Sequence, residues 1–139
     1  MQRTIEDEIA KGSKVFFIAD NHAPDDPEFK MMFPPHCVRG SEEAQVIPEL
    51  SKYPGKLVPK THDSAFFATA LDETLRDLKP HKLTVCGVCT DICVLYTVAD
   101  ARNRGYQVEV PAGCVATFDT EAHEWALQRM EKILGAVIT

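Results

Sequence analysis

Residues 82–104 read KLTVCGVCTDICVLYTVADARNR, and this stretch predicts a strand that leads directly into a helix. Residues 82–88 form an apolar run of strand length, and residues 91–104 carry an apolar stripe at helical spacing that stops at Gly105. Residues 106–110 (YQVEV) predict another strand. A strand, a helix and a second strand in this order predict a parallel β-α-β unit.

Strands and helices also alternate through the rest of the chain. A weakly amphipathic helix is expected over residues 1–12, followed by a strand over residues 14–19 (KVFFIA) that is buried on both faces. Further segments are expected at residues 57–59 (strand), 68–78 (helix), 120–134 (helix) and 135–139 (strand). This alternation predicts an α/β fold of one domain over residues 1–139, a three-layer α/β/α arrangement with a mainly parallel sheet.

The composition excludes several classes of protein. The chain has 139 residues, of which 45% are hydrophobic, and a net charge of −6 without a basic cluster, which argues against nucleic-acid binding. No apolar run approaches the roughly 20 residues of a membrane helix, and no basic-then-apolar leader opens the chain. Five cysteines, three of them at positions 86, 89 and 93, favour thiol or metal chemistry in a reducing compartment. We therefore expect a soluble, cytoplasmic domain.

Residues capable of catalysis or metal binding follow three of the predicted strands. Asp20 and His22 come after the first strand, Lys60 after the second, and Cys89 and Cys93 after the third. Ligands of open α/β sheets bind beyond the carboxyl ends of the strands. We therefore expect these side chains to reach the same edge of the sheet.

Four residues form a candidate metal site. Asp20 and His22 are two apart, so their side chains leave an extended chain on one side. His36, behind the stiff Phe-Pro-Pro run, adds a second imidazole, and Glu28 adds a second carboxylate. Such a set suits zinc, manganese or iron(II). The alternative is that the Asp-x-His run is merely polar sequence at a strand exit.

Cys93 is the candidate nucleophile. It lies at the start of a predicted helix, where the helix dipole favours the thiolate, and a nearby Lys60 would favour it further. Alternatives are a buried apolar role for Cys93, a redox pair of Cys86 and Cys89, a zinc site that adds Cys93 to that pair, and a dyad of Cys93 with His62. A redox pair would need its first cysteine at the helix start, whereas Cys86 lies inside the predicted strand.

The remaining cysteines and histidines receive no catalytic role. Cys37, Cys86 and Cys114 are expected to be small apolar residues of the interior. His81 and His123 are expected at the surface.

Three stretches together resemble the isochorismatase-like cysteine hydrolase superfamily, and within it the nicotinamidases (pyrazinamidases) most closely. They are FFIADNHAPDDPEFKMMFPPHCVRGSEEAQVIPEL (16–50), VPKTHDSAF (58–66) and VCGVCTDICVLYTVADARNRGYQVEV (85–110). The resemblance implies that Cys93 is the nucleophile and Lys60 the catalytic lysine. It also implies an oxyanion hole made by the backbone N–H groups of Cys89 and Cys93, with a cis peptide bond between Val88 and Cys89.

The resemblance further implies a substrate site and one divalent metal ion. The ligands would be Asp20, His22 and His36, with Glu28 as a possible fourth. In nicotinamidases the ion binds the pyridine nitrogen of the substrate, and Phe33 stands where the family has an aromatic wall; Val88 is also placed at the substrate. Asp63 departs from the pattern, because nicotinamidases usually have an aromatic residue at this position.

The implied function is hydrolysis of nicotinamide to nicotinic acid and ammonia through a Cys93 thioester, as a step of pyridine nucleotide salvage, by a homo-oligomer. The family's catalytic aspartate stands on a first strand that the quoted stretches lack, which suggests an N-terminally truncated chain; Asp7 and Glu8 lie in a predicted helix and substitute poorly. Alternatives are a hydrolase of the same superfamily acting on a different small amide or on isochorismate, and a catalytically impaired homologue. A metal site argues against isochorismate, because that branch does not use the ion.

Overall fold

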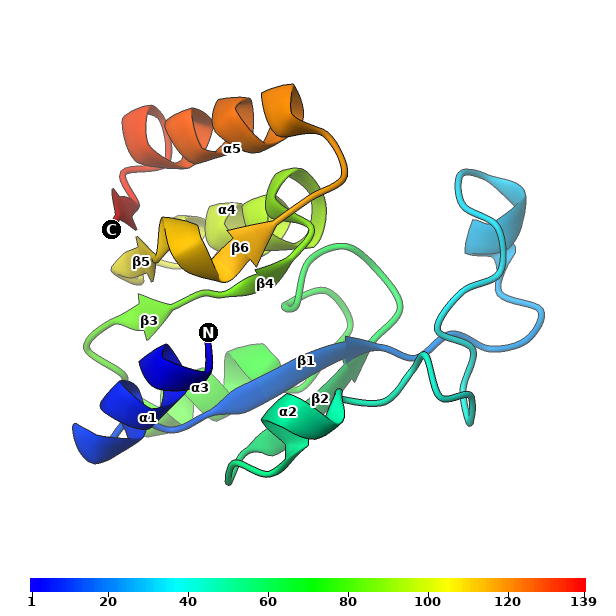
Figure 1. Ribbon diagram of the computed structural model, residues 1–139, viewed down its shortest axis with the longest axis horizontal. Coiled ribbons are helices and arrows are strands. Elements are labelled where there is room, and N and C mark those ends of the chain that lie inside the picture. The colour runs from blue at the N-terminus through cyan, green and yellow to red at the C-terminus, as the bar shows by residue number, and fades with distance from the viewer. The chain divides into compact units, whose positions relative to one another are not determined.

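The structure is a computed structural model that describes residues 1–139 (Figure 1). It consists of two compact units. The first comprises residues 2–62, and the second comprises residues 63–139 together with Met1.

The first unit contains two parallel strands and three helical segments. Its elements are α1 (Gln2–Ala10), β1 (Phe16–Asp20), the 3₁₀ helix η1 (Pro27–Lys30), α2 (Pro48–Ser51) and β2 (Lys56–Lys60). Strand β1 pairs with β2 in a register that sets Phe16 opposite Lys56 and Asp20 opposite Lys60. A side chain at Gly55 would lie 2.5 Å from the ring of Phe17, so this turn requires glycine.

The second unit carries the strand-helix alternation of the sequence. Its elements are α3 (Leu71–Leu78), β3 (Leu83–Thr84), β4 (Gly87–Val88), the π-helix η2 (Thr90–Val94), α4 (Leu95–Asn103), β5 (Val108–Val110), the 3₁₀ helix η3 (Ala112–Cys114), β6 (Val115–Ala116), α5 (Thr120–Lys132) and β7 (Val137–Ile138). The strands pair in parallel, in the orders β3-β5-β7 and β4-β6. The expected α/β fold with parallel strands is therefore confirmed.

Two details of the expected strands are wrong. The strand expected over residues 82–88 is divided into β3, which pairs with β5, and β4, which pairs with β6. Gly87, the first residue of β4, has φ +129°, outside the backbone region of a regular strand. The paired strands form three separate sheets, β1-β2, β3-β5-β7 and β4-β6, rather than one continuous sheet. Strand β1 is only half-buried, and its Ile18 is 36% exposed, because β1 pairs with β2 alone.

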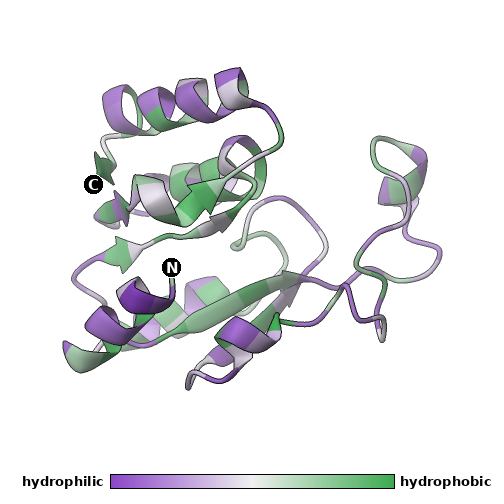
Figure 2. Cartoon of the chain, in the orientation of Figure 1, coloured by the Kyte–Doolittle hydropathy of each residue, from purple (hydrophilic) through white to green (hydrophobic).

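The core of the second unit lies between its strands and helices. Val98 of α4, Val110 of β5 and Met130 of α5 are completely buried. Figure 2 shows apolar residues concentrated in the strands, whereas α1 and α5 are largely hydrophilic. Asp119 caps α5, because its carboxylate accepts hydrogen bonds from the N–H groups of Glu121 and Ala122.

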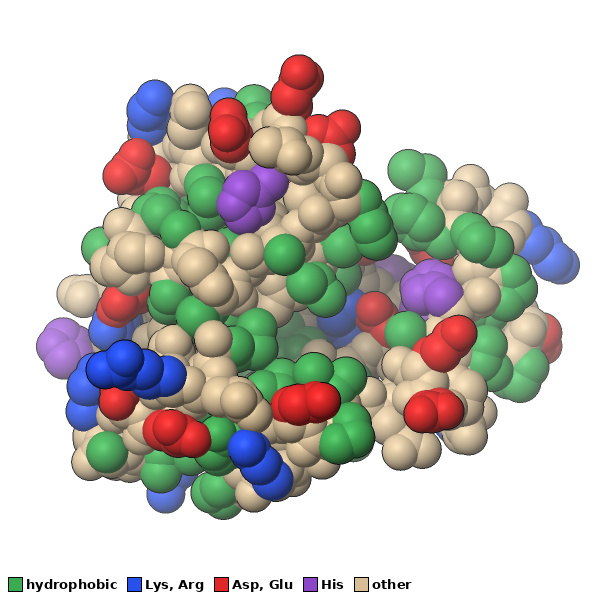
Figure 3. Space-filling view, viewed as in Figure 1, with side chains coloured by type: hydrophobic (Ala, Val, Ile, Leu, Met, Phe, Trp, Pro, Cys, Tyr) green, Lys and Arg blue, Asp and Glu red, His purple; other side chains and the backbone are tan.

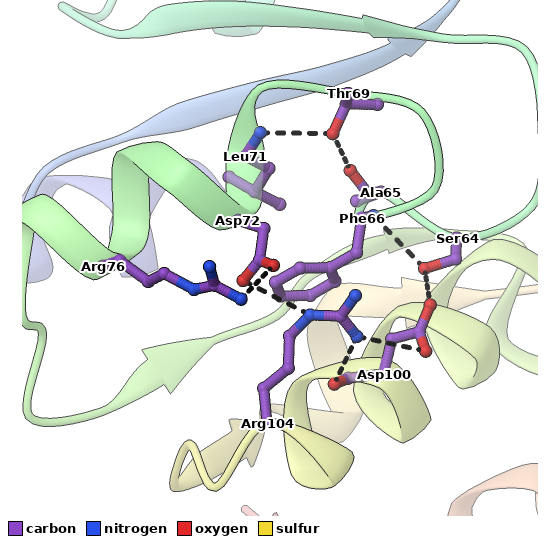
Figure 4. A network of polar contacts seen from close by, with 9 residues as sticks. All are labelled: Ser64, Ala65, Phe66, Thr69, Leu71, Asp72, Arg76, Asp100 and Arg104. Atoms are coloured by element: carbon purple, nitrogen blue, oxygen red, sulfur yellow. Dashed lines mark hydrogen bonds and ion pairs between the residues drawn. The ribbon is translucent and has the colours of Figure 1, made fainter.

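Hydrogen bonds fix the loop before α3 to helix α4 (Figure 4). The Ser64 hydroxyl donates to the Asp100 carboxylate over 2.5 Å, and the Ala65 N–H donates to the Thr97 hydroxyl over 3.0 Å. The Phe66 N–H donates to the Ser64 oxygen over 3.2 Å. Since Ser64 is buried, its hydroxyl joins the loop and the helix away from water.

Arg104 continues this network towards α3 (Figure 4). Its guanidinium pairs with Asp100 and with Asp72, each over 3.3 Å, and lies 4.7 Å from the centre of the Phe66 ring. Arg76 pairs with the same Asp72 over 2.9 Å. The network joins α3, α4 and the loop before α3.

No helix of the chain is both long enough and apolar enough to cross a membrane. Figure 3 shows acidic and basic side chains scattered over the visible face, in keeping with the charge balance of the sequence.

Candidate functional site

The first unit brings three of the predicted metal ligands together. Asp20 ends β1, His22 follows it by two residues, and His36 comes from the loop that leads on to β2. Their ligating atoms all lie within 4.8 Å of one another. His22 is 3% exposed, whereas Asp20 and His36 are half-buried. The cluster is therefore partly covered by protein, and Asp20 and His36 remain partly accessible to solvent.

Backbone hydrogen bonds explain why His22 and His36 meet although 14 positions separate their numbers. The His22 N–H donates to the Cys37 carbonyl over 3.1 Å, and the Arg39 N–H donates to the His22 carbonyl over 2.8 Å. His22 and Val38 form an isolated parallel bridge. This bridge holds the segment after the Phe-Pro-Pro run beside the end of β1.

Both imidazole rings are oriented through Nδ1. The His22 Nδ1 lies 2.9 Å from the Asp26 carboxylate, and the His36 Nδ1 lies 2.9 Å from the Pro34 carbonyl. Since both partners are acceptors, each Nδ1 is the hydrogen-bond donor of its ring, and in a neutral imidazole this arrangement leaves the Nε2 lone pair for a metal ion. Two imidazole Nε2 atoms and one carboxylate suit a divalent ion of the zinc, manganese or iron type. The residues present thus fit a metal ion.

Asp26 is fixed on both of its carboxylate oxygens. One accepts the Glu28 N–H over 3.0 Å, and the other accepts from His22. The hydrogen bonds from Glu28 and His22 lower the pKa of Asp26 below its ordinary value of 3.8. Asp26 therefore stays ionised under ordinary conditions.

Glu28 and Phe33 lie around this cluster. Glu28 is half-buried on η1 and is not among the side chains whose ligating atoms meet within 4.8 Å. Phe33 is 37% exposed, and its ring stands edge-on to that of His36 with 6.0 Å between the ring centres. Phe29 packs against both imidazoles, with ring centres 5.2 Å from His22 and 5.6 Å from His36.

Lys60 is buried at the end of β2, with 6% of its surface exposed. Its ammonium group donates to the carboxylate of Asp20 and, over 2.9 Å, to the carbonyl of His62. The Nδ1 atom of His62 lies 3.0 Å from the Thr61 hydroxyl. The two strand ends that the sequence placed at one edge thus meet through an ion pair, which satisfies the buried charge of Lys60.

Cys93 belongs to the second unit, where it is half-buried in η2. This π-helix leads directly into α4, so Cys93 stands before the regular helix rather than in its first turn. The Cys89 carbonyl accepts the N–H groups of Ile92 and Val94 over 3.2 and 3.1 Å and thereby starts the turn. Single π-turns of this kind are frequent at functional sites.

The peptide bond between Val88 and Cys89 is cis. The resemblance had implied this bond, and that expectation is confirmed. Val88 is 67% exposed, and Cys89 is half-buried with an extended backbone ahead of η2.

None of the five cysteines forms a disulfide. Cys37, Cys86 and Cys114 are half-buried rather than fully interior. Burial and contact with the Cys114 thiol raise the pKa of Cys86 to about 12. The Cys86 thiol is therefore protonated at neutral pH.

His123 is not a plain surface residue, which corrects the expectation from sequence. Its Nδ1 lies 2.9 Å from the hydroxyl of Thr90, which is completely buried and is the first residue of η2. The contact spans 33 positions and forms because α5 packs against η2. No local pattern in the sequence signals it.

The isochorismatase domain family matches residues 2–139. The chain belongs to the isochorismatase family. Its relatives include the uncharacterised isochorismatase family protein PncA of Bacillus subtilis (strain 168), 36% identical over 141 residues, with 94% of this chain and 76% of the relative covered. The nicotinamidase of Escherichia coli (strain K12) is 40% identical over 91 residues, which cover 56% of this chain and less than half (43%) of that protein.

Solved structures of the isochorismatase family share the fold. The nicotinamidase/pyrazinamidase PncA from Bacillus subtilis is 36% identical with a TM-score of 0.91, and the match covers 99% of this chain and 81% of that one. The pyrazinamidase of Pyrococcus horikoshii in complex with zinc is 26% identical with a TM-score of 0.90, over 99% of this chain and 81% of that one. The chain is therefore similar in fold to both of these enzymes.

Proposed function

We propose that this isochorismatase-family chain is a metal-dependent amidase that hydrolyses nicotinamide to nicotinic acid and ammonia. The observation that carries the proposal is the cluster of Asp20, His22 and His36 within 4.8 Å. The resemblance links such a cluster to the nicotinamidase branch and not to the isochorismate branch. Similarity to a nicotinamidase of 40% identity supports the same assignment.

In this proposal Cys93 performs nucleophilic catalysis. Its thiolate forms a bond to the amide carbon, and the carbonyl electron pair moves onto oxygen. Backbone N–H groups of Cys89 and Cys93 stabilise that oxyanion, an effect typically worth about 100- to 1000-fold in rate for each donor. The oxyanion then collapses, the C–N bond breaks and ammonia leaves with the proton that the Cys93 thiol lost when it became the thiolate. Water cleaves the resulting thioester to give the acid and the thiol.

Asp20, His22 and His36 of the first unit would hold the ion, Asp20 through its carboxylate and each histidine through Nε2. Glu28 is a candidate fourth ligand. When bound there, a divalent ion supplies a Lewis-acidic site for a ring nitrogen. Phe33, edge-on to His36, is proposed to flank the aromatic ring of the substrate.

Lys60 is proposed as the catalytic lysine. Its ammonium group is buried and stays hydrogen-bonded to Asp20 and to the His62 carbonyl, so it is a fixed positive charge rather than a mobile surface group. A fixed charge stabilises developing negative charge without reorganisation.

The test is ammonia release from nicotinamide by the purified chain with added Zn²⁺, Mn²⁺ or Fe²⁺. Benzamide is the matched control substrate, because it has the same amide and ring size but no ring nitrogen. We expect turnover of nicotinamide that a chelator abolishes, and turnover of benzamide at least about 100-fold slower.

Equal rates on the two amides would contradict the proposed role of the ion. Cleavage of isochorismate without amide hydrolysis would assign the chain to the other branch. Ion binding without any turnover would identify the chain as a catalytically impaired homologue.

A further inference from the structure

The loop between β1 and β2 (Figure 1, light blue to cyan) contains a carboxylate, Asp26, that contacts one of the three clustered side chains but is not one of them. Asp26 lies four residues after His22, and its Oδ2 contacts His22 Nδ1 over 2.9 Å. His22 is the most buried of the three clustered side chains, with 3% of its surface exposed. A buried imidazole depends on its protein partner for its orientation, because water does not reach it freely.

The second oxygen of Asp26 makes the carboxylate rigid. Asp26 is the residue before η1, and its Oδ1 accepts the Glu28 N–H of that helix over 3.0 Å. Pro27 then fixes the backbone at the first position of η1. With one oxygen bound to the backbone, the other is held at a fixed place and angle for His22.

The other histidine of the cluster is oriented by a backbone group instead of a side chain. His36 Nδ1 is held by the backbone carbonyl of Pro34, which no side-chain substitution removes. Of the two groups that orient the imidazoles, the Asp26 carboxylate is therefore the one that a side-chain substitution can remove. The Asp26 carboxylate also places a negative charge next to Nδ1 of His22, which makes Nε2 a stronger metal ligand.

We propose that Asp26 is a positioning residue of the metal site, which fixes His22 as the tautomer with its proton on Nδ1 and directs Nε2 to the ion. The inference rests on the proposed metal-dependent function and deepens it. It assigns Asp26 no contact with the ion or the substrate. Its role is to present a ligand as one tautomer and in one orientation.

The experiment measures Zn²⁺ affinity by competition with a chromophoric chelator, for the whole chain and for Asp26→Ala, Asp26→Asn and Asp25→Ala. Asp25→Ala is the matched control, because it removes the same charge from the neighbouring, exposed position. His36→Ala identifies the part of the Zn²⁺ signal that belongs to the cluster. Imidazole ¹⁵N spectra without metal, recorded at pH 8, report the His22 tautomer independently of any ion.

We expect Asp26→Ala to bind Zn²⁺ about 10- to 100-fold more weakly, whereas Asp25→Ala binds as the unmodified chain does. Asp26→Asn keeps an acceptor oxygen and should lose less affinity than Asp26→Ala. The spectra should show His22 protonated on Nδ1 in the unmodified chain and a mixture of tautomers in Asp26→Ala.

Two results would overturn the inference, and they differ from each other. Equal Zn²⁺ affinity and an unchanged His22 tautomer in Asp26→Ala would refute the role of Asp26 alone. Absence of any His36-dependent Zn²⁺ binding in the unmodified chain would refute the metal-dependent function and this inference with it.

Discussion

Lys60 donates a hydrogen bond to Asp20, the residue directly opposite it in the β1-β2 register. The pair is shielded, because Lys60 is buried and the Asp20 side chain is 24% exposed. One carboxylate thus serves two groups, the ammonium of Lys60 and the cluster with His22 and His36. A positive charge so close to a cation site lowers the affinity of that site.

Replacing Lys60 should therefore strengthen metal binding while it removes activity. Lys60→Met keeps the length of the side chain but releases Asp20 from its ion pair. We expect Zn²⁺ affinity to rise by about tenfold or more, since each 1.4 kcal/mol is about tenfold in affinity. Lys30→Met removes the same charge from an exposed position of η1 and should leave the affinity unchanged. Weaker binding in Lys60→Met would refute this account of the pair.

The Thr90–His123 hydrogen bond should stabilise the turn that carries Cys93. Thr90→Val keeps the shape of the buried side chain but removes the hydroxyl. We expect the free energy of unfolding to fall by about 1 kcal/mol, the usual net value of such a bond. Urea unfolding of Thr90→Val and His123→Ala, with the exposed His81→Ala as control, measures it. If His123→Ala and His81→Ala unfold alike, the bond contributes nothing.

Met130 should be a principal source of stability in the second unit. It is completely buried on α5, whereas Met32 is 76% exposed. Met130→Ala removes buried apolar contacts and leaves a cavity, so we expect a loss of about 2 to 5 kcal/mol. The same substitution at Met32 should change the free energy of unfolding by less than about 0.5 kcal/mol. Similar losses in the two variants would contradict the assigned core.

The raised pKa of Cys86 predicts a loss of stability in alkali. Burial and the Cys114 thiol raise the pKa of Cys86 from 9.0 to about 12. Between these values the unfolded chain loses the proton that the native chain keeps, so the free energy of unfolding falls as pH rises. Urea unfolding at pH 8 and pH 10.5 should show a smaller fall in Cys86→Ala than in the unmodified chain. Equal falls would show that Cys86 titrates normally.

The sequence predicted the parts of this molecule that follow from regular spacing. Asp20 and Lys60 each follow an apolar run, so the order of residues along the chain was enough to infer their meeting at parallel strand ends. The helix expected over residues 120–134 corresponds closely to α5, because Asp119 and the apolar spacing mark it. The cluster of Asp20, His22 and His36 was likewise inferred from residue type and order.

Other features depend on contacts that no local pattern records. The partnership of Thr90 with His123 arises only when α5 packs against η2. Residues 82–88 have the pattern of one apolar strand, yet β3 pairs with β5 and β4 pairs with β6, and Gly87 at the start of β4 has a positive φ. The contact of Asp26 with His22 requires the loop geometry around η1, since Asp25 is chemically identical and makes no such contact.

The central claim is that Cys93 is the nucleophile of an amidase. Ammonia release from nicotinamide with added Zn²⁺ should be compared between the unmodified chain, Cys93→Ala and Cys114→Ala, a half-buried cysteine to which the proposal gives no catalytic role. The account predicts a rate more than about 1000-fold lower in Cys93→Ala, and an unchanged rate in Cys114→Ala. Turnover by Cys93→Ala at the rate of the unmodified chain would contradict it.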